Sequence, residues 1–190
     1  VARLKEQLAG ARNAALEEAA IICSGIRSYE WAKDIRALKS FKEGNELYGR
    51  KEYRASAEKY RQTFEYNPEF RGIAYFFLAN SYDQLYKDAH KGEPENDAYL
   101  QKAIENYKLA IDKIKDTDDP GGTAPDVRRR SFEYLFAAYK DKMKDYALAE
   151  PVAKQMVDRE PGDPTNYQLL GALYSNKEFR SIDPESWTFI

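Results

Sequence analysis

Small and apolar residues recur along the chain at alternating steps of three and four, which is the period of an amphipathic α-helix. Near the N-terminus this spacing predicts a helix over residues 2–25 with one buried face. Ser28 is a suitable N-cap for a second, longer helix that ends near Gly49, and a third helix follows and stops before Pro68. No stretch alternates apolar and polar residues for long enough to predict a strand. The pattern therefore predicts an all-α chain.

The helical pattern also repeats along the chain. In one unit, small residues stand at Gly44 and Ser56, where two helices would approach closely, and Pro68 ends the second helix. Together with the large Tyr60, these positions resemble the tetratricopeptide repeat (TPR), a helix–turn–helix unit of ~34 residues. Similar positions recur farther along the chain, so the expected units are 37–70, 72–115, 129–162 and a partial 164–179.

The resemblance implies a right-handed α-solenoid of TPR-like repeats with a capping helix at each end. We expect residues 1–36, which include the start of the long second helix, to form the N-terminal cap, and 37–179 to form the array. Residues 180–190 would form a C-terminal cap, or a tail that mediates self-association through Trp187, Phe189 and Ile190. Polar insertions near 87–98 and 116–124 contain Pro or Gly and are expected to be loops.

The family resemblance further implies a concave groove, lined by the first helix of each unit, that binds a peptide or helix of a partner protein. Positions of the family that face the groove fall here on Phe41, Asn45, Tyr48, Phe76, Asn80, Asp83, Arg130, Glu133 and Lys140. The aromatic members either form a platform for apolar side chains or belong to the core. On the binding hypothesis, Phe76→Ala or Asn80→Ala should weaken partner capture and leave the thermal midpoint nearly unchanged.

Some TPR domains clamp the C-terminal carboxylate of a partner, and they place Asn where this chain has Asn45 and Asn80. That clamp also requires cations at positions that Phe41, Glu133 and Ala137 occupy here. Without a cation, a carboxylate has no charge-assisted partner. The similarity therefore stops short of the carboxylate clamp.

Composition excludes several classes of function. The 30 Lys and Arg residues against 32 Asp and Glu give a net charge of −2, so the positive field of a nucleic-acid-binding protein is missing. Cys23 and His90 are the single Cys and the single His, which leaves little for a disulfide, a Cys/His zinc site or a catalytic triad. No apolar run approaches the ~20 residues that span a bilayer. We expect no catalytic residue, no metal, no cofactor, no nucleic-acid partner and no membrane insertion.

Arg128, Arg129 and Arg130 lie near the start of a predicted helix, where the helix dipole disfavours positive charge. They either mark an anionic partner or form a solvated turn that is balanced by nearby aspartates.

The sequence thus predicts a non-enzymatic protein-interaction scaffold. The alternative is a TPR segment that recruits partners to a larger enzyme, such as a glycosyltransferase, with no catalytic residue in this chain. The chain begins with Val1, so a targeting signal could have been trimmed, and the compartment, cytoplasmic or exported, stays open.

Overall fold

The computed structural model describes residues 25, 28–115 and 124–175, and in these residues the chain forms helices and no strand. The prediction of an all-α chain is confirmed for them. A helix described over residues 28–49 is followed by α2 (Tyr53–Tyr66), α3 (Ile73–Leu85), the 3-10 turn η1 (Asp88–His90), α4 (Pro94–Lys113), α5 (Ala124–Ala137), the π-helical η2 (Ala138–Met143), α6 (Tyr146–Arg159) and α7 (Pro164–Ser175). The expected helix 2–25 with Cys23, most of the 116–124 insertion, and the tail with Trp187, Phe189 and Ile190 lie outside the described residues.

The expected helix ends near Gly49 and before Pro68 are confirmed. The helix over 28–49 ends at residue 49, and α2 ends at Tyr66. The expected loop over 87–98 is shorter than predicted, because α4 already begins at Pro94. Proline fits the first turn of a helix, where its missing N–H would lack a partner in any case, and acidic Glu95 and Asp97 suit the same turn.

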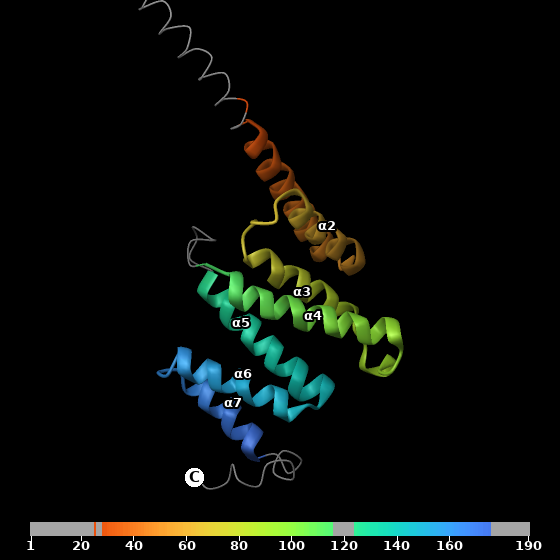
Figure 1. Cartoon of the computed structure of the whole chain (residues 1–190). Coiled ribbons are helices and arrows are strands. Elements are labelled where there is room, and N and C mark those ends of the chain that lie inside the picture. Colours follow the sequence, from red (N-terminus) through yellow and green to blue (C-terminus); the bar gives the residue numbers. More distant parts are fainter. Residues whose placement is uncertain (1–24, 26–27, 116–123, 176–190) are drawn as a thin grey trace, which may run out of the picture.

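The helices are arranged in a row. From α2 to α7, each helix packs against the next one in the sequence, and α3 also contacts α5. In Figure 1 the row runs from the helix over 28–49 at one end to α7 at the other. Among the described helices, contacts are therefore concentrated between neighbours in the row.

One arrangement of side chains occurs in both of the first two helix pairs. A tyrosine with no exposed surface on the second helix of the pair donates a hydrogen bond to an asparagine on the first helix. Tyr60 donates to Oδ1 of Asn45, and Tyr107 donates to Oδ1 of Asn80, each at 2.7 Å. Gly44 makes room for the first of these rings, since a Cβ atom there would lie 2.7 Å from Cε1 of Tyr60.

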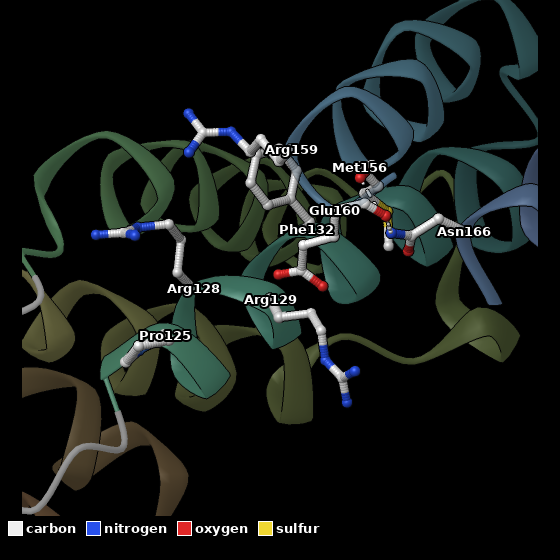
Figure 2. Close-up of a pocket in the computed structure, with 8 residues that line it drawn as sticks. All are labelled: Pro125, Arg128, Arg129, Phe132, Met156, Arg159, Glu160 and Asn166. Atoms are coloured by element: carbon white, nitrogen blue, oxygen red, sulfur yellow. Dashed lines mark hydrogen bonds between the residues drawn. The ribbon is translucent and has the colours of Figure 1, made fainter. Parts of the chain in front are cut away.

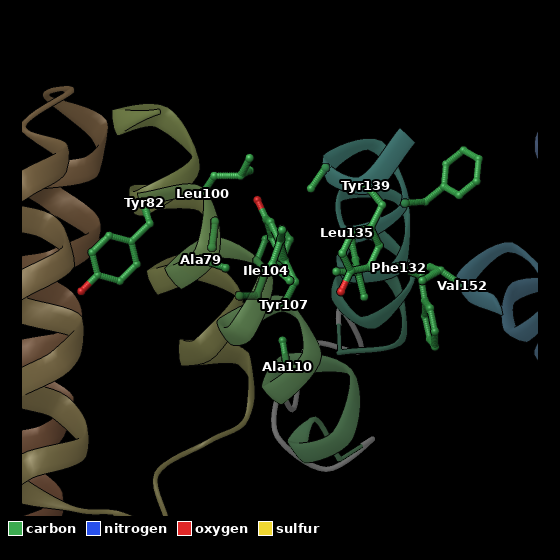
Figure 3. Close-up of a cluster of buried hydrophobic side chains, with 14 of the residues drawn as sticks. Ala79, Tyr82, Leu100, Ile104, Tyr107, Ala110, Phe132, Leu135, Tyr139 and Val152 are labelled. Atoms are coloured by element: carbon green, nitrogen blue, oxygen red, sulfur yellow. The ribbon is translucent and has the colours of Figure 1, made fainter. Parts of the chain in front are cut away.

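In the third helix pair, α5 and α6, the large and small side chains occupy the opposite helices from those in the first two pairs. By sequence spacing, Phe136 on α5 corresponds to Gly44, and Ala153 on α6 corresponds to the tyrosines; both are buried. Ala137 stands at the asparagine position, so the hydrogen-bond acceptor is absent together with the tyrosine that would need it. The large buried side chain therefore stands on the first helix of this pair and the small one on the second. Figure 3 shows the core on both sides of α4, with Tyr82 directed toward α2 and Val152 on α6.

Candidate partner-binding face

Three successive first helices contribute to one face of the molecule: the helix over 28–49, α3, and α5 with η2. Burial raises the pKa of the Tyr48 hydroxyl, and the nearby charges of Tyr53, Tyr134 and Asp83 raise it further. Tyr48, Asp83 and Tyr134 come from the three different helices. The ring of Tyr134 on α5 stacks on that of Phe76 on α3 at 5.9 Å, and Lys142 of η2 lies 2.6 Å from Asp83 on α3, so these helices adjoin here. We call the surface around Tyr48, Asp83 and Tyr134 the partner face.

The aromatic residues that the sequence assigned to this surface differ in exposure. Phe41 is half-buried, with its ring centroid 5.7 Å from that of Tyr60, and Tyr48 is half-buried against Tyr53 at 5.3 Å. Phe76 is only 4% exposed and belongs to the core, so it is not part of the partner face. Removing its ring would create a cavity, so Phe76→Ala should lower stability, unlike the sequence-based expectation of an unchanged thermal midpoint.

Asn45 and Asn80 are both tied to the fold. Asn45 is exposed and Asn80 half-buried, yet each side-chain oxygen accepts the bond from a buried tyrosine. Burial raises the pKa of both tyrosine hydroxyls, which keeps them protonated as donors. Neither asparagine Nδ2 donates a hydrogen bond to a described residue, so these two amide groups remain for a partner. The expectation that Asn80→Ala leaves the thermal midpoint unchanged no longer follows.

The centre of the partner face carries an ion pair. Lys142 Nζ lies 2.6 Å from Oδ1 of Asp83, and the ammonium also lies 5.6 Å from the ring centroid of Tyr86. Both charged side chains are about three-quarters buried, at 25% and 21% exposure. The pair joins α3 to η2 across the face.

The remaining charged candidates lie on α5 and η2. Glu133 is half-buried and its carboxylate lies 3.6 Å from Arg129, while Arg130 is exposed. Lys140 is paired with Asp141 at 2.8 Å. These side chains give α5 and η2 exposed charges of both signs.

Sequence reasoning missed Tyr134 and Lys142. Tyr134 is 43% exposed and its ring stacks on that of buried Phe76 at 5.9 Å. It lies one position from Glu133, so a wider stripe on the same helix would have included it. Lys142 belongs to η2, where the wider π-helical turn changes the direction of every following side chain. A regular α-helical period could not have found it.

The arginine run does not form a convergent anion site. Arg128 donates a hydrogen bond to the carbonyl of Ile114, and Arg129 is paired with Asp163 at 3.3 Å. Arg128, Arg129 and Arg159 line a cavity of about 200 Å³. Figure 2 shows their guanidinium groups pointing in different directions, with the carboxylate of Glu160 between them.

Among the described residues, no group of three or more His, Cys, Asp or Glu side chains is placed to hold a metal ion. His90 lies on the surface with Nδ1 2.8 Å from Oε1 of Glu93. Within the same part of the chain, no helix combines the length and apolar character that crossing a membrane requires.

No family model matches the sequence, and no curated protein shows a significant match to it. The function of the partner face must therefore be argued from its own geometry.

Proposed function

We propose that the chain is a TPR-like solenoid that binds an extended segment of a partner protein on the partner face and catalyses no reaction. The observation that supports the proposal best is the recurring bond from a buried tyrosine to an asparagine at the same register of two successive helix pairs. A repeated unit places equivalent side chains side by side along one surface, which suits a chain-like ligand.

The groups on the partner face match the needs of such a ligand. The Nδ2 groups of Asn45 and Asn80 would donate to carbonyl oxygens of the bound backbone. Tyr134 offers a partly exposed ring to an apolar side chain. Lys142 and Asp83 would exchange their mutual bond for charged groups of the partner, which gives the face specificity rather than raw affinity.

Affinity capture from native lysate, with mass spectrometry, tests the proposal through a matched pair of variants. Lys142→Ala removes a lysine that lies over Tyr86 on the partner face, and Lys102→Ala removes a lysine that lies 5.4 Å from the ring of Tyr82 but projects from α4. Proteins whose recovery falls with Lys142→Ala and Tyr134→Ala, and not with Lys102→Ala, support binding at the partner face. If Lys142→Ala, Tyr134→Ala and Lys102→Ala all recover every captured protein equally well, the proposal is wrong.

A further inference from the structure

A second and larger cavity, of about 460 Å³, lies between α4, α5 with η2, and α6. The cavity shares α5 and η2 with the partner face, but Tyr48, Asp83, Tyr134 and Lys142 are not among its lining residues, so it is a separate site. Its floor includes the buried side chains Phe132 and Leu135 of α5, Tyr139 of η2 and Val152 of α6, which Figure 3 shows. Leu148 at its edge is 42% exposed. A cavity of this size and apolar character is typical of a ligand site.

Two cations stand over this apolar floor. The ammonium of Lys108 lies 5.6 Å from the ring centroid of Tyr139, and the guanidinium of Arg159 lies 5.2 Å from that of Phe132. Neither makes an ion pair with a described residue, whereas the carboxylate of Asp112 at the rim lies 3.4 Å from Lys113. Within the described part of the chain, these two positive groups therefore have no carboxylate at ion-pair distance.

The chain contains an equivalent cleft one helix pair earlier, of about 270 Å³, between α2, α3 and α4. There Arg54 lies 2.8 Å from Oε1 of Glu95 and 2.6 Å from the hydroxyl of Tyr99, so its charge is neutralised within the protein. Lys102 lines the same cleft, lies 5.4 Å from the ring of Tyr82 and, like Lys108, has no ion pair with a described residue. The two clefts therefore differ in one cation: Arg54 is paired with a carboxylate of the chain, and Arg159 is paired with none that the structure describes. In the larger cavity neither Lys108 nor Arg159 is paired with a described carboxylate, so both can pair with carboxylates of a ligand.

We propose that the α4–α5–α6 cavity binds an acidic amphipathic peptide segment of a partner protein. An aliphatic or aromatic side chain of that segment would enter against Leu148 and Val152, and flanking carboxylates would pair with Lys108 and Arg159. The rim also carries the polar side chain of Gln155, which can bond peptide groups and favours a peptide over a lipid. This site is independent of the partner face and stands even if that face binds nothing.

Selection of a random-peptide library on the full chain, with counter-selection on the Lys108→Gln/Arg159→Gln variant, tests the proposal. Enriched peptides should carry a bulky apolar residue flanked by Asp or Glu. In direct titration the double variant should bind them about tenfold more weakly. Chemical shifts should change at Leu148 and Val152 and not at Tyr134.

Lys102→Gln is the matched control. Lys102 belongs to α4, as Lys108 does, but it stands over the ring of Tyr82 on α3 instead of lining the larger cavity. Lys102→Gln should leave peptide affinity unchanged. Decanoate, which carries one carboxylate on an apolar chain, is titrated separately to test whether the cavity binds a lipid and not a peptide. The proposal is overturned if selection yields no peptide that depends on Lys108 and Arg159, if the peptides lack carboxylates, or if decanoate alone produces the shifts at Leu148 and Val152.

Discussion

An asparagine on a binding face can be held there by the core beneath it, and Asn80 is such a residue. Replacing it by alanine removes the acceptor for the fully buried Tyr107 hydroxyl. An unsatisfied buried hydroxyl costs about 1–3 kcal/mol, so Asn80→Ala should lower the free energy of unfolding by that amount. Urea denaturation measures it.

A double-mutant cycle separates this bond from other effects of the substitution. Tyr107→Phe removes the hydroxyl, so adding Asn80→Ala to it should cost clearly less than Asn80→Ala alone. Equal costs in the two backgrounds would show that the bond contributes nothing. Comparing Tyr107→Phe with the double variant Asn80→Ala/Tyr107→Phe in binding assays also isolates the contribution of the Asn80 amide group, because these two proteins should have similar stability.

Glu150 gives the fold a dependence on acid pH. Burial raises the pKa of its carboxyl, but hydrogen bonds from Lys154 and from the Tyr174 hydroxyl lower it more, so the net pKa lies below its ordinary value. A depressed folded pKa adds stability above the unfolded pKa of about 4.3, and this is lost as pH falls through the folded value.

We therefore expect wild type to be more stable than Glu150→Gln at neutral pH, with the difference shrinking below about pH 4. Urea midpoints across this range give the measurement. A difference that stays constant down to acid pH would mean that ionisation of Glu150 does not stabilise the contact between α6 and α7.

At the scale of the helix, one crowded glycine and one uncrowded glycine test how closely neighbouring helices approach each other. Gly72 is the N-cap residue of α3, and a Cβ atom there would overlap the backbone nitrogen of Ile114 and the carbonyl group of Lys113. Backbone cannot move aside as a flexible side chain can, so Gly72→Ala should destabilise by about 1–3 kcal/mol. Gly171 lies within α7, and nothing lies within 4 Å of its Cβ position.

Gly171→Ala should therefore raise stability by about 0.5–1 kcal/mol, because alanine is the better helix former. Thermal denaturation of both variants checks the pair. If Gly72→Ala proves harmless, then α3 and the end of α4 do not meet as closely as described.

The elements themselves were largely predictable, and the site was less so. The three-and-four spacing of apolar residues and the breaker at Pro68 are local signals, so they located helix ends such as Tyr66. Lys142 was beyond such signals because η2 departs from the α-helical period. The burial of Phe76 also depends on Tyr134, which belongs to another helix. Contacts between helices decide exposure, and periodicity along one helix does not contain them.

At the scale of the whole molecule, burial is concentrated in the middle of the row of helices. The buried residues of α3 include Phe76, Leu78 and Tyr82, and those of α4 include Leu100, Ile104 and Tyr107. At the far end, α7 buries Asn166 and Leu173 among its described residues. A row with contacts between neighbours has no single centre that holds both ends, so local opening should be easiest at its ends.

Native-state hydrogen exchange should therefore show a gradient of protection, with the slowest amides in α3 and α4 and faster exchange in α7. Phe76→Ala should lower protection in α3, α4 and α5, because Phe76 belongs to α3 and its ring contacts Tyr107 of α4 and Tyr134 of α5, and should change α7 least. Uniform protection across all helices, falling equally in the variant, would instead describe one cooperative unit. In that case binding at either proposed surface would stabilise the whole chain, whereas a gradient confines the effect of each partner to the helices that it touches.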